Sequence, residues 1–159
     1  MENVQQFLIA LAHNRVIMSA GCSWALAQII KTIIYGIVNK EFRPERLVGS
    51  GGMPSCHSAS VCGLAVSILI TEGIGSPLFA IAAILAIIVM YDARGVRLET
   101  GKQAEALNEI IELLDKLGSP ISNEQKFKEF IGHTPLQVGA GAILGICFAC
   151  LYCFVIVPV

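Results

Sequence analysis

Four apolar stretches, each bounded by polar or charged residues, decide what this chain can fold into. They run from about residue 16 to 38, 55 to 71, 76 to 91 and 135 to 157. A helix needs about 20 apolar residues to cross the hydrocarbon core of a bilayer, with a usual range of roughly 17 to 25. The composition agrees, because 55% of the 159 residues are hydrophobic and only 14% are charged, which is unlike a soluble domain. The sequence therefore predicts an all-α integral membrane protein, one domain over residues 1–159 with about four transmembrane helices.

The segment between the third and fourth stretches has a different character. Over about 98–131, leucine and isoleucine recur mostly every three or four residues among Glu, Lys and Gln. This spacing predicts an amphipathic helix that ends at Gly118 and lies on the membrane or covers the mouth of the bundle. A second short helix is expected over about 123–131. Residues 1–14 either lie along the membrane surface or lengthen the first helix.

The basic residues are distributed unevenly between the two ends of the predicted bundle. Nine of the 11 lysines and arginines lie in the first and third connections, whereas the opposite side carries only Arg15. The positive-inside rule places these two connections in the cytoplasm and both termini outside. We expect the membrane to be a bacterial plasma membrane and membrane lipids to be partners. A net charge of −1 with no basic stripe argues against a nucleic-acid partner; the oligomeric state is not predicted.

Four of the six cysteines lie inside apolar stretches: Cys22, Cys147, Cys150 and Cys153. We interpret them as small packing residues. The last three are spaced by three residues, but no histidine or carboxylate accompanies them. Helix packing explains this stripe better than a metal site, so we expect neither a metal nor another cofactor.

A polar, glycine-led segment, Gly51–Ser58 (GGMPSCHS), precedes the second stretch. Its glycines and Pro54 favour a tight turn, and Ser55 or Ser58 can cap the helix that follows. The amino end of a helix attracts anions, and His57 can exchange a proton near neutral pH. The segment indicates oxyanion chemistry. The alternative is an ordinary turn at a helix start with a solvated histidine.

Other polar residues are expected at the same end of the bundle. His133 precedes the fourth stretch in a similar setting, so two helix starts supply a nucleophile and a general acid. Lys31 lies inside the first stretch, where a charge is costly unless it faces a polar interior; the alternative is that it extends toward the headgroups. Asp92 and Arg97 follow the third stretch, and they form either part of the site or an interfacial salt bridge.

Several ordered motifs carry a family resemblance over nearly the whole chain. They are Gly51–Ser58, Val89–Arg97, the following Gly101–Ala104 with Leu107–Asn108, and Gly132–Pro135. They resemble the divergent branch of the type 2 phosphatidic acid phosphatase and vanadium haloperoxidase-related superfamily. The resemblance implies an intramembrane phosphatase in which one histidine attacks phosphorus, another protonates the leaving group, and Lys and Arg bind phosphate.

The second of the superfamily's motifs, Pro-Ser-Gly-His, is similar to Pro54–His57. The resemblance makes His57 the acid and Ser55 a substrate-binding residue, with Cys56 in place of the glycine that lets the backbone approach phosphate. Lys31 corresponds to the lysine of the first motif, but Arg43-Pro44 lies too far from it for the parent spacing.

The third motif is divided in this sequence. Arg97 resembles its arginine, with Val96 in place of the preceding serine, and His133 resembles its nucleophile, although only five residues separate the two in the parent motif. Gln137 stands four residues after His133, where the parent has an orienting Asp. A neutral amide stabilises an imidazolium less than a carboxylate does.

The predicted function is a phosphatase or phosphotransferase, similar to acid phosphatases, that acts on a lipid-like or isoprenoid phosphate. Its mechanism would use histidines and no metal. The alternative is a non-catalytic membrane protein that binds anionic headgroups or transports a small solute or lipid. Gln137 and the divided motif favour the alternative, whereas Lys31, His57, Arg97 and His133 at one depth favour the enzyme.

Overall fold

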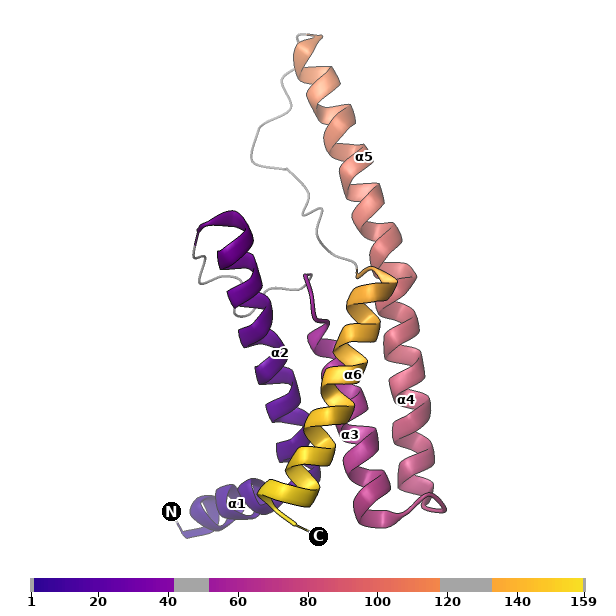
Figure 1. Ribbon diagram of the computed structural model, residues 1–159. Coiled ribbons are helices and arrows are strands. Elements are labelled where there is room, and N and C mark those ends of the chain that lie inside the picture. Colours follow the sequence, from indigo (N-terminus) through magenta and orange to yellow (C-terminus); the bar gives the residue numbers. More distant parts are fainter. Residues whose placement is uncertain (1, 42–51, 118–132, 159) are drawn as a thin grey trace.

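The computed structural model describes residues 2–41, 52–117 and 133–158, and this part of the chain is helical with no strand. Figure 1 shows the order of the helices. They are α1 (Glu2–His13), α2 (Arg15–Asn39), α3 (Cys56–Glu72), α4 (Pro77–Arg94), α5 (Val96–Lys116) and α6 (Pro135–Leu151), which continues as a π-helical turn, η3 (Tyr152–Ile156). The predicted all-α class is confirmed.

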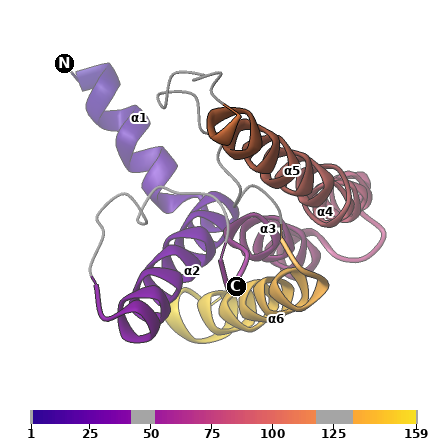
Figure 2. The same cartoon turned by 90° about the horizontal axis from the view of Figure 1, so that it is seen from above.

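Helices α2, α3, α4 and α6 form the bundle, with α3 packed against each of the other three (Figures 1 and 2). Within the residues that the structure describes, three segments are long and apolar enough to cross a membrane: Arg15–Asn39, Pro77–Leu114 and Pro135–Ile156. Helix α3, at 17 residues, is apolar but shorter. The protein is therefore a helical membrane bundle in which α3 lies among the other three helices.

Small residues let the backbones of α3 and α6 approach closely. A Cβ atom at Gly141 would overlap the carbonyl oxygen of Ser55, and one at Gly145 would overlap that of Ala59. On the other side of α3, a Cβ at Gly63 would come within 2.6 Å of Ser23 Oγ. Lipid supplies no hydrophobic force between helices, so this close van der Waals packing holds the bundle together.

The first helix is separate from the first long helix. Asn14 ends α1 and caps α2, because its side chain accepts hydrogen bonds from the N–H groups of Val16 and Ile17 at 3.1 Å. Helix α1 lies crosswise to α2 and exposes apolar side chains such as Phe7 and Leu8 (Figure 1). The alternative in which these residues lengthen the first helix is wrong, since a capping side chain and an extended Asn14 backbone interrupt it.

Helix α5 begins directly after α4, with Gly95 between them. It extends away from the bundle and does not lie across the helix ends (Figures 1 and 2). The expectation that this amphipathic helix covers the mouth is therefore wrong for its described part, because a junction of a single residue lets α5 continue beyond the end of α4. The short helix expected over about 123–131 lies outside the described residues.

The described chain begins and finishes at the same end of the bundle (Figure 1). Two basic residues lie at the opposite end, where α5 starts: Lys40, the C-cap of α2, and Arg94, in the last turn of α4. Which end faces the cytoplasm remains a prediction.

The cysteine stripe on α6 and η3 is only partly a packing feature. Cys153 is fully buried and Cys150 is half-buried, but Cys147 is exposed. Three residues turn a helix by less than one full revolution, so such a stripe drifts around the surface and cannot stay on one face. Within the described ranges, no three histidine, cysteine or acidic side chains gather in a way that could hold a metal ion.

Candidate functional site

The starts of α3 and α6 meet at the end of the bundle where α4 stops. The backbone N–H of Ser55, the N-cap of α3, donates to the carbonyl oxygen of Gln137 in α6 at 3.0 Å. The N–H of His133 donates to the carbonyl oxygen of Ala93, near the end of α4, at 3.2 Å. Two helix N-termini are thereby fixed side by side, and both present backbone N–H groups and positive dipole ends.

The two predicted histidines are neighbours in space, although 75 residues separate them in the chain. The ring centroids of His57 and His133 lie 6.1 Å apart, with an edge-to-face angle of 62°. His133 is almost fully buried and His57 is half-buried. At this separation both rings can contact one phosphoryl group.

The amide of Gln137 determines which nitrogen of His133 carries the proton. Its Oε1 accepts a hydrogen bond from the backbone N–H of Thr134 at 3.1 Å, and lies 3.2 Å from His133 Nδ1. A backbone N–H can only donate, so the atom facing it must be the amide oxygen, and Nδ1 must then carry a hydrogen. In a neutral ring this leaves the lone pair on Nε2, which is the arrangement that a nucleophilic histidine needs.

Lys31 is buried inside the protein, with 3% of its surface exposed. Its stem packs against the segment before α3, because a Cβ at Gly52 would lie 3.1 Å from both Lys31 Cγ and Cδ. Gly52 has a φ of 85°, which favours glycine. Lys31 also lines a cavity of about 170 Å³ with Tyr35 and Met53. The alternative in which Lys31 extends toward lipid headgroups is therefore wrong.

Ser55 and Cys56 have structural contacts of their own. Ser55 is fully buried, and its Oγ caps α3 by accepting from the N–H of Ser58 at 3.4 Å; of the two expected caps, Ser55 is the one used. Cys56 is also buried, in a cluster with Ala27 and Ala59, and its Sγ lies 3.8 Å from His57 Nδ1. The Cys56 side chain thus occupies the interior where the parent motif has glycine.

Asp92 and Arg97 lie on either side of the α4–α5 junction. Asp92 is half-buried in the last turns of α4. Arg97 is in the first turn of α5, only four residues after Ala93, whose carbonyl binds the backbone of His133. The two halves of the divided motif therefore approach each other in space at backbone level. The side chain of Arg97, and with it the alternative of an Asp92–Arg97 salt bridge, lies outside the described residues.

Three contributions to this site were not predicted. Thr134 and Gln137 form a capping box, which the sequence Thr-x-x-Gln before an apolar stretch could have revealed. The close contact of Gly52 with Lys31 and the bond from His133 to the Ala93 carbonyl have no sequence signal, because they depend on how the helices pack.

Comparison with known proteins identifies the family. A family model described as the divergent PAP2 family matches residues 12–148. The chain belongs to this family. It is similar to an uncharacterized membrane protein of Bacillus subtilis (strain 168), YuiD, with 34% identity over 145 residues, which cover 86% of this chain and 92% of the relative. No solved structure matches the chain significantly. The matched range of this divergent PAP2 protein contains every candidate site residue.

Proposed function

We propose that this divergent PAP2 protein is a membrane phosphatase or phosphotransferase that acts on a lipid-like or isoprenoid phosphate. The observation that supports this most directly is the His57–His133 pair at two joined helix starts, with His133 Nδ1 held by Gln137 Oε1. Membership of the divergent PAP2 family supports the same reaction class.

In the proposed reaction, His133 Nε2 attacks phosphorus while the bond from phosphorus to the leaving oxygen breaks. His57 gives its proton to that oxygen, so a neutral alcohol departs and a phosphohistidine remains. His57, now neutral, takes a proton from an attacking water or alcohol, and the nitrogen–phosphorus bond breaks. Phosphate or a new phosphate ester leaves, and both histidines return to their starting states.

The electrostatic setting supports binding of the charged group. The N-termini of α3 and α6 favour an anion, and Lys31, buried beside the start of α3, supplies an amine that can carry a positive charge where little solvent screens it. We propose that Arg97 approaches from the junction with α5. Following the positive-inside rule, we also propose that the site opens on the cytoplasmic side of a bacterial plasma membrane.

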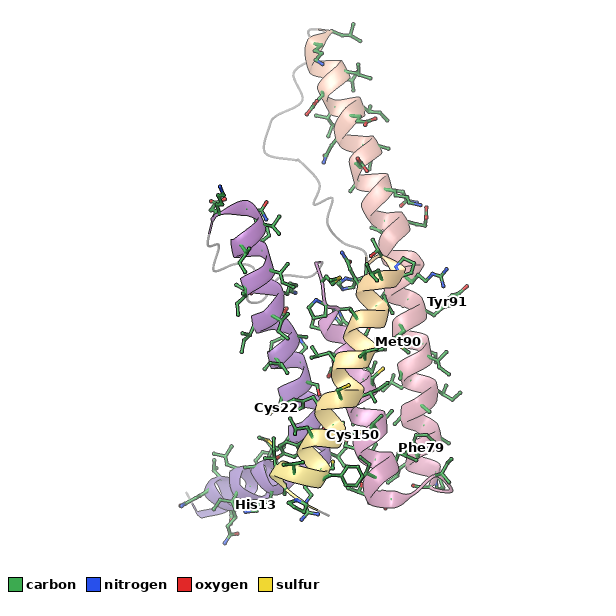
Figure 3. The ribbon with its side chains drawn as sticks, viewed as in Figure 1. His13, Cys22, Phe79, Met90, Tyr91 and Cys150 are labelled. Carbon is green, nitrogen blue, oxygen red and sulfur yellow. The ribbon has the colours of Figure 1, made fainter. Side chains whose placement is uncertain are left out.

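The test is phosphate release from a panel of lipid and isoprenoid phosphates by purified protein in bilayers. His133→Ala should abolish release and any phosphoenzyme. A matched control is His13→Ala, because His13 is exposed on α1 at the other end of the bundle, where its Nδ1 lies 2.7 Å from the carbonyl oxygen of Ile9 (Figure 3). Equal release by the unaltered and His133→Ala proteins across the panel would refute the hydrolase.

The second candidate is a non-catalytic protein that binds anionic headgroups or carries a small solute or lipid. Gln137 favours it, because an amide at hydrogen-bond distance from His133 Nδ1 supports an imidazolium less than a carboxylate does. This candidate predicts that vanadate or phosphate binds at the histidine pair while no substrate on the panel turns over.

A further inference from the structure

Ser58 is a fully buried hydroxyl in the first turn of α3, directly after His57. Its backbone N–H donates to Ser55 Oγ, but its own Oγ has no hydrogen-bond partner among the described residues. A buried hydroxyl without a partner is costly, and each such group in a native protein calls for an explanation.

Four other hydroxyls in the bundle have a hydrogen-bond partner inside their own helix. They donate to a carbonyl oxygen one turn earlier in their own helix, at 2.8 to 3.0 Å. These residues are Ser23, Thr32, Ser67 and Thr71. For Ser58 the carbonyl four residues earlier belongs to Pro54, which precedes the helix. The lack of an internal partner at Ser58 therefore follows from its place at the helix start.

Helix geometry shows what Ser58 faces. Cys62, one turn later on the same face of α3, has its Sγ 3.8 Å from Met90 Sδ on α4. Helices α3 and α4 are antiparallel neighbours joined by a short loop. A residue one helical turn before Cys62 on α3 therefore lies level with a residue one helical turn after Met90 on α4. That position is Ala93, whose carbonyl oxygen binds the N–H of His133. Ser58 thus faces the junction of three helices where His133 is held.

Ser19 Oγ and Gln28 Oε1 are also buried and have no hydrogen-bond partner in the described part of the chain. Ser19 lies in the early turns of α2, far along the bundle from the start of α3. Gln28 Oε1 is an acceptor only, which an anion would repel. Ser58 combines a hydroxyl that can donate with a place beside the histidine pair.

We propose that Ser58 is a substrate-binding residue whose hydroxyl donates a hydrogen bond to a non-bridging oxygen of the phosphoryl group held between His57 and His133. The inference rests on the proposed function, and it adds a hydrogen-bond donor on the interior side of the site. The hydroxyl is prepositioned by the first turn of α3, and it needs no reorganisation when the anion arrives.

The test measures the affinity of the purified protein for vanadate and for inorganic phosphate. Ser58→Ala should weaken both by roughly ten- to a hundredfold, the usual effect of losing a hydrogen bond to a charged group. The matched control is Ser67→Ala, which removes another fully buried serine hydroxyl of α3, one that already donates to the Gly63 carbonyl at 2.8 Å. This variant should bind both anions as the unaltered protein does.

Unfolding of the same variants without ligand separates a binding role from a structural one. Ser58→Ala should unfold at the same or a higher denaturant concentration, since it removes a polar group that has no partner among the described residues. If Ser58→Ala binds vanadate as tightly as the unaltered protein, or if its affinity loss is matched by Ser67→Ala, the inference is overturned. If vanadate or phosphate binding depends on Ser58 but no substrate is turned over, the inference is supported and only the proposed hydrolase activity is contradicted. Failure of the unaltered protein to bind either anion overturns both.

Discussion

The contact of Gly141 with the start of α3 allows a direct test of how packing builds the site. A Cβ at this position would overlap the carbonyl oxygen of Ser55 and lie 3.1 Å from both its carbonyl carbon and its nitrogen. Since backbone atoms cannot rotate aside as a side chain can, Gly141→Ala must push α6 away from α3. We expect the variant to fold less stably and to bind vanadate more weakly, because the same Ser55 caps α3 and donates to Gln137.

The magnitude follows from two opposing effects. Alanine is favoured over glycine within a helix by roughly 0.5–1 kcal/mol, whereas overpacking costs about 1–3 kcal/mol. Gly139→Ala on the same helix isolates the first effect, because no atom lies within 4 Å of a Cβ built there. The control should therefore gain stability by roughly 0.5–1 kcal/mol, and Gly141→Ala should fall below the control by about 1–3 kcal/mol.

The assay is reversible unfolding in mixed micelles with increasing denaturing detergent, followed by loss of helical circular dichroism. Vanadate affinity is measured on the same three proteins in the folded range. Equal unfolding transitions for the two alanine variants would refute the close packing of α6 on Ser55. A stability loss without a change in vanadate affinity would refute the link between this contact and the site.

Three further predictions concern the site and its orientation. Lys31→Leu should insert into the membrane as well as the unaltered protein but bind vanadate at least tenfold more weakly, because it removes a buried cation; unchanged vanadate affinity would exclude Lys31 from the site. Gln137→Glu should keep the capping box, since a carboxylate also accepts from Thr134 N–H, and raise turnover or phosphoenzyme labelling by stabilising the His133 imidazolium; a fall in labelling with intact folding would contradict the proposed role. For topology, cysteine at Lys116 should react with an impermeant reagent only from the cytoplasm, and cysteine at Ile74 only from outside, in a background without the native cysteines; the reverse pattern would invert the orientation.

Much of the fold could be predicted because the membrane leaves few options. A backbone in hydrocarbon must satisfy its hydrogen bonds internally, so apolar stretches of this length become helices. Their limits were also readable in the chain: Ser55 before α3, Ser76 and Pro77 at the start of α4, and Pro135 at the start of α6 are local signals. Asn14 is such a signal too, and it decides between the two alternatives for residues 1–14.

The candidate site was predictable in its residue types but not in its assembly. His57 and His133 could be proposed because each stands at a helix start and resembles a motif residue. Their separation of 6.1 Å depends on α3 and α6 packing at the same level, which is decided by Gly141 and Gly145 against the α3 backbone. By its spacing in the sequence, the divided third motif departs from that of the parent superfamily. The hydrogen bond from His133 to the Ala93 carbonyl brings its two halves closer at backbone level after folding.

The amino-acid sequence is enough to predict that the protein lies in a membrane, where its helices run, and the chemical character of one end of the bundle. These properties depend on composition, periodicity and caps, which act over a few neighbouring residues. Folding in three dimensions then buries Lys31 against Gly52, makes His57 and His133 neighbours, and directs α5 away from the mouth. The physical reason is that these features depend on contacts between residues distant in the chain, or on the direction that a junction of one residue imposes.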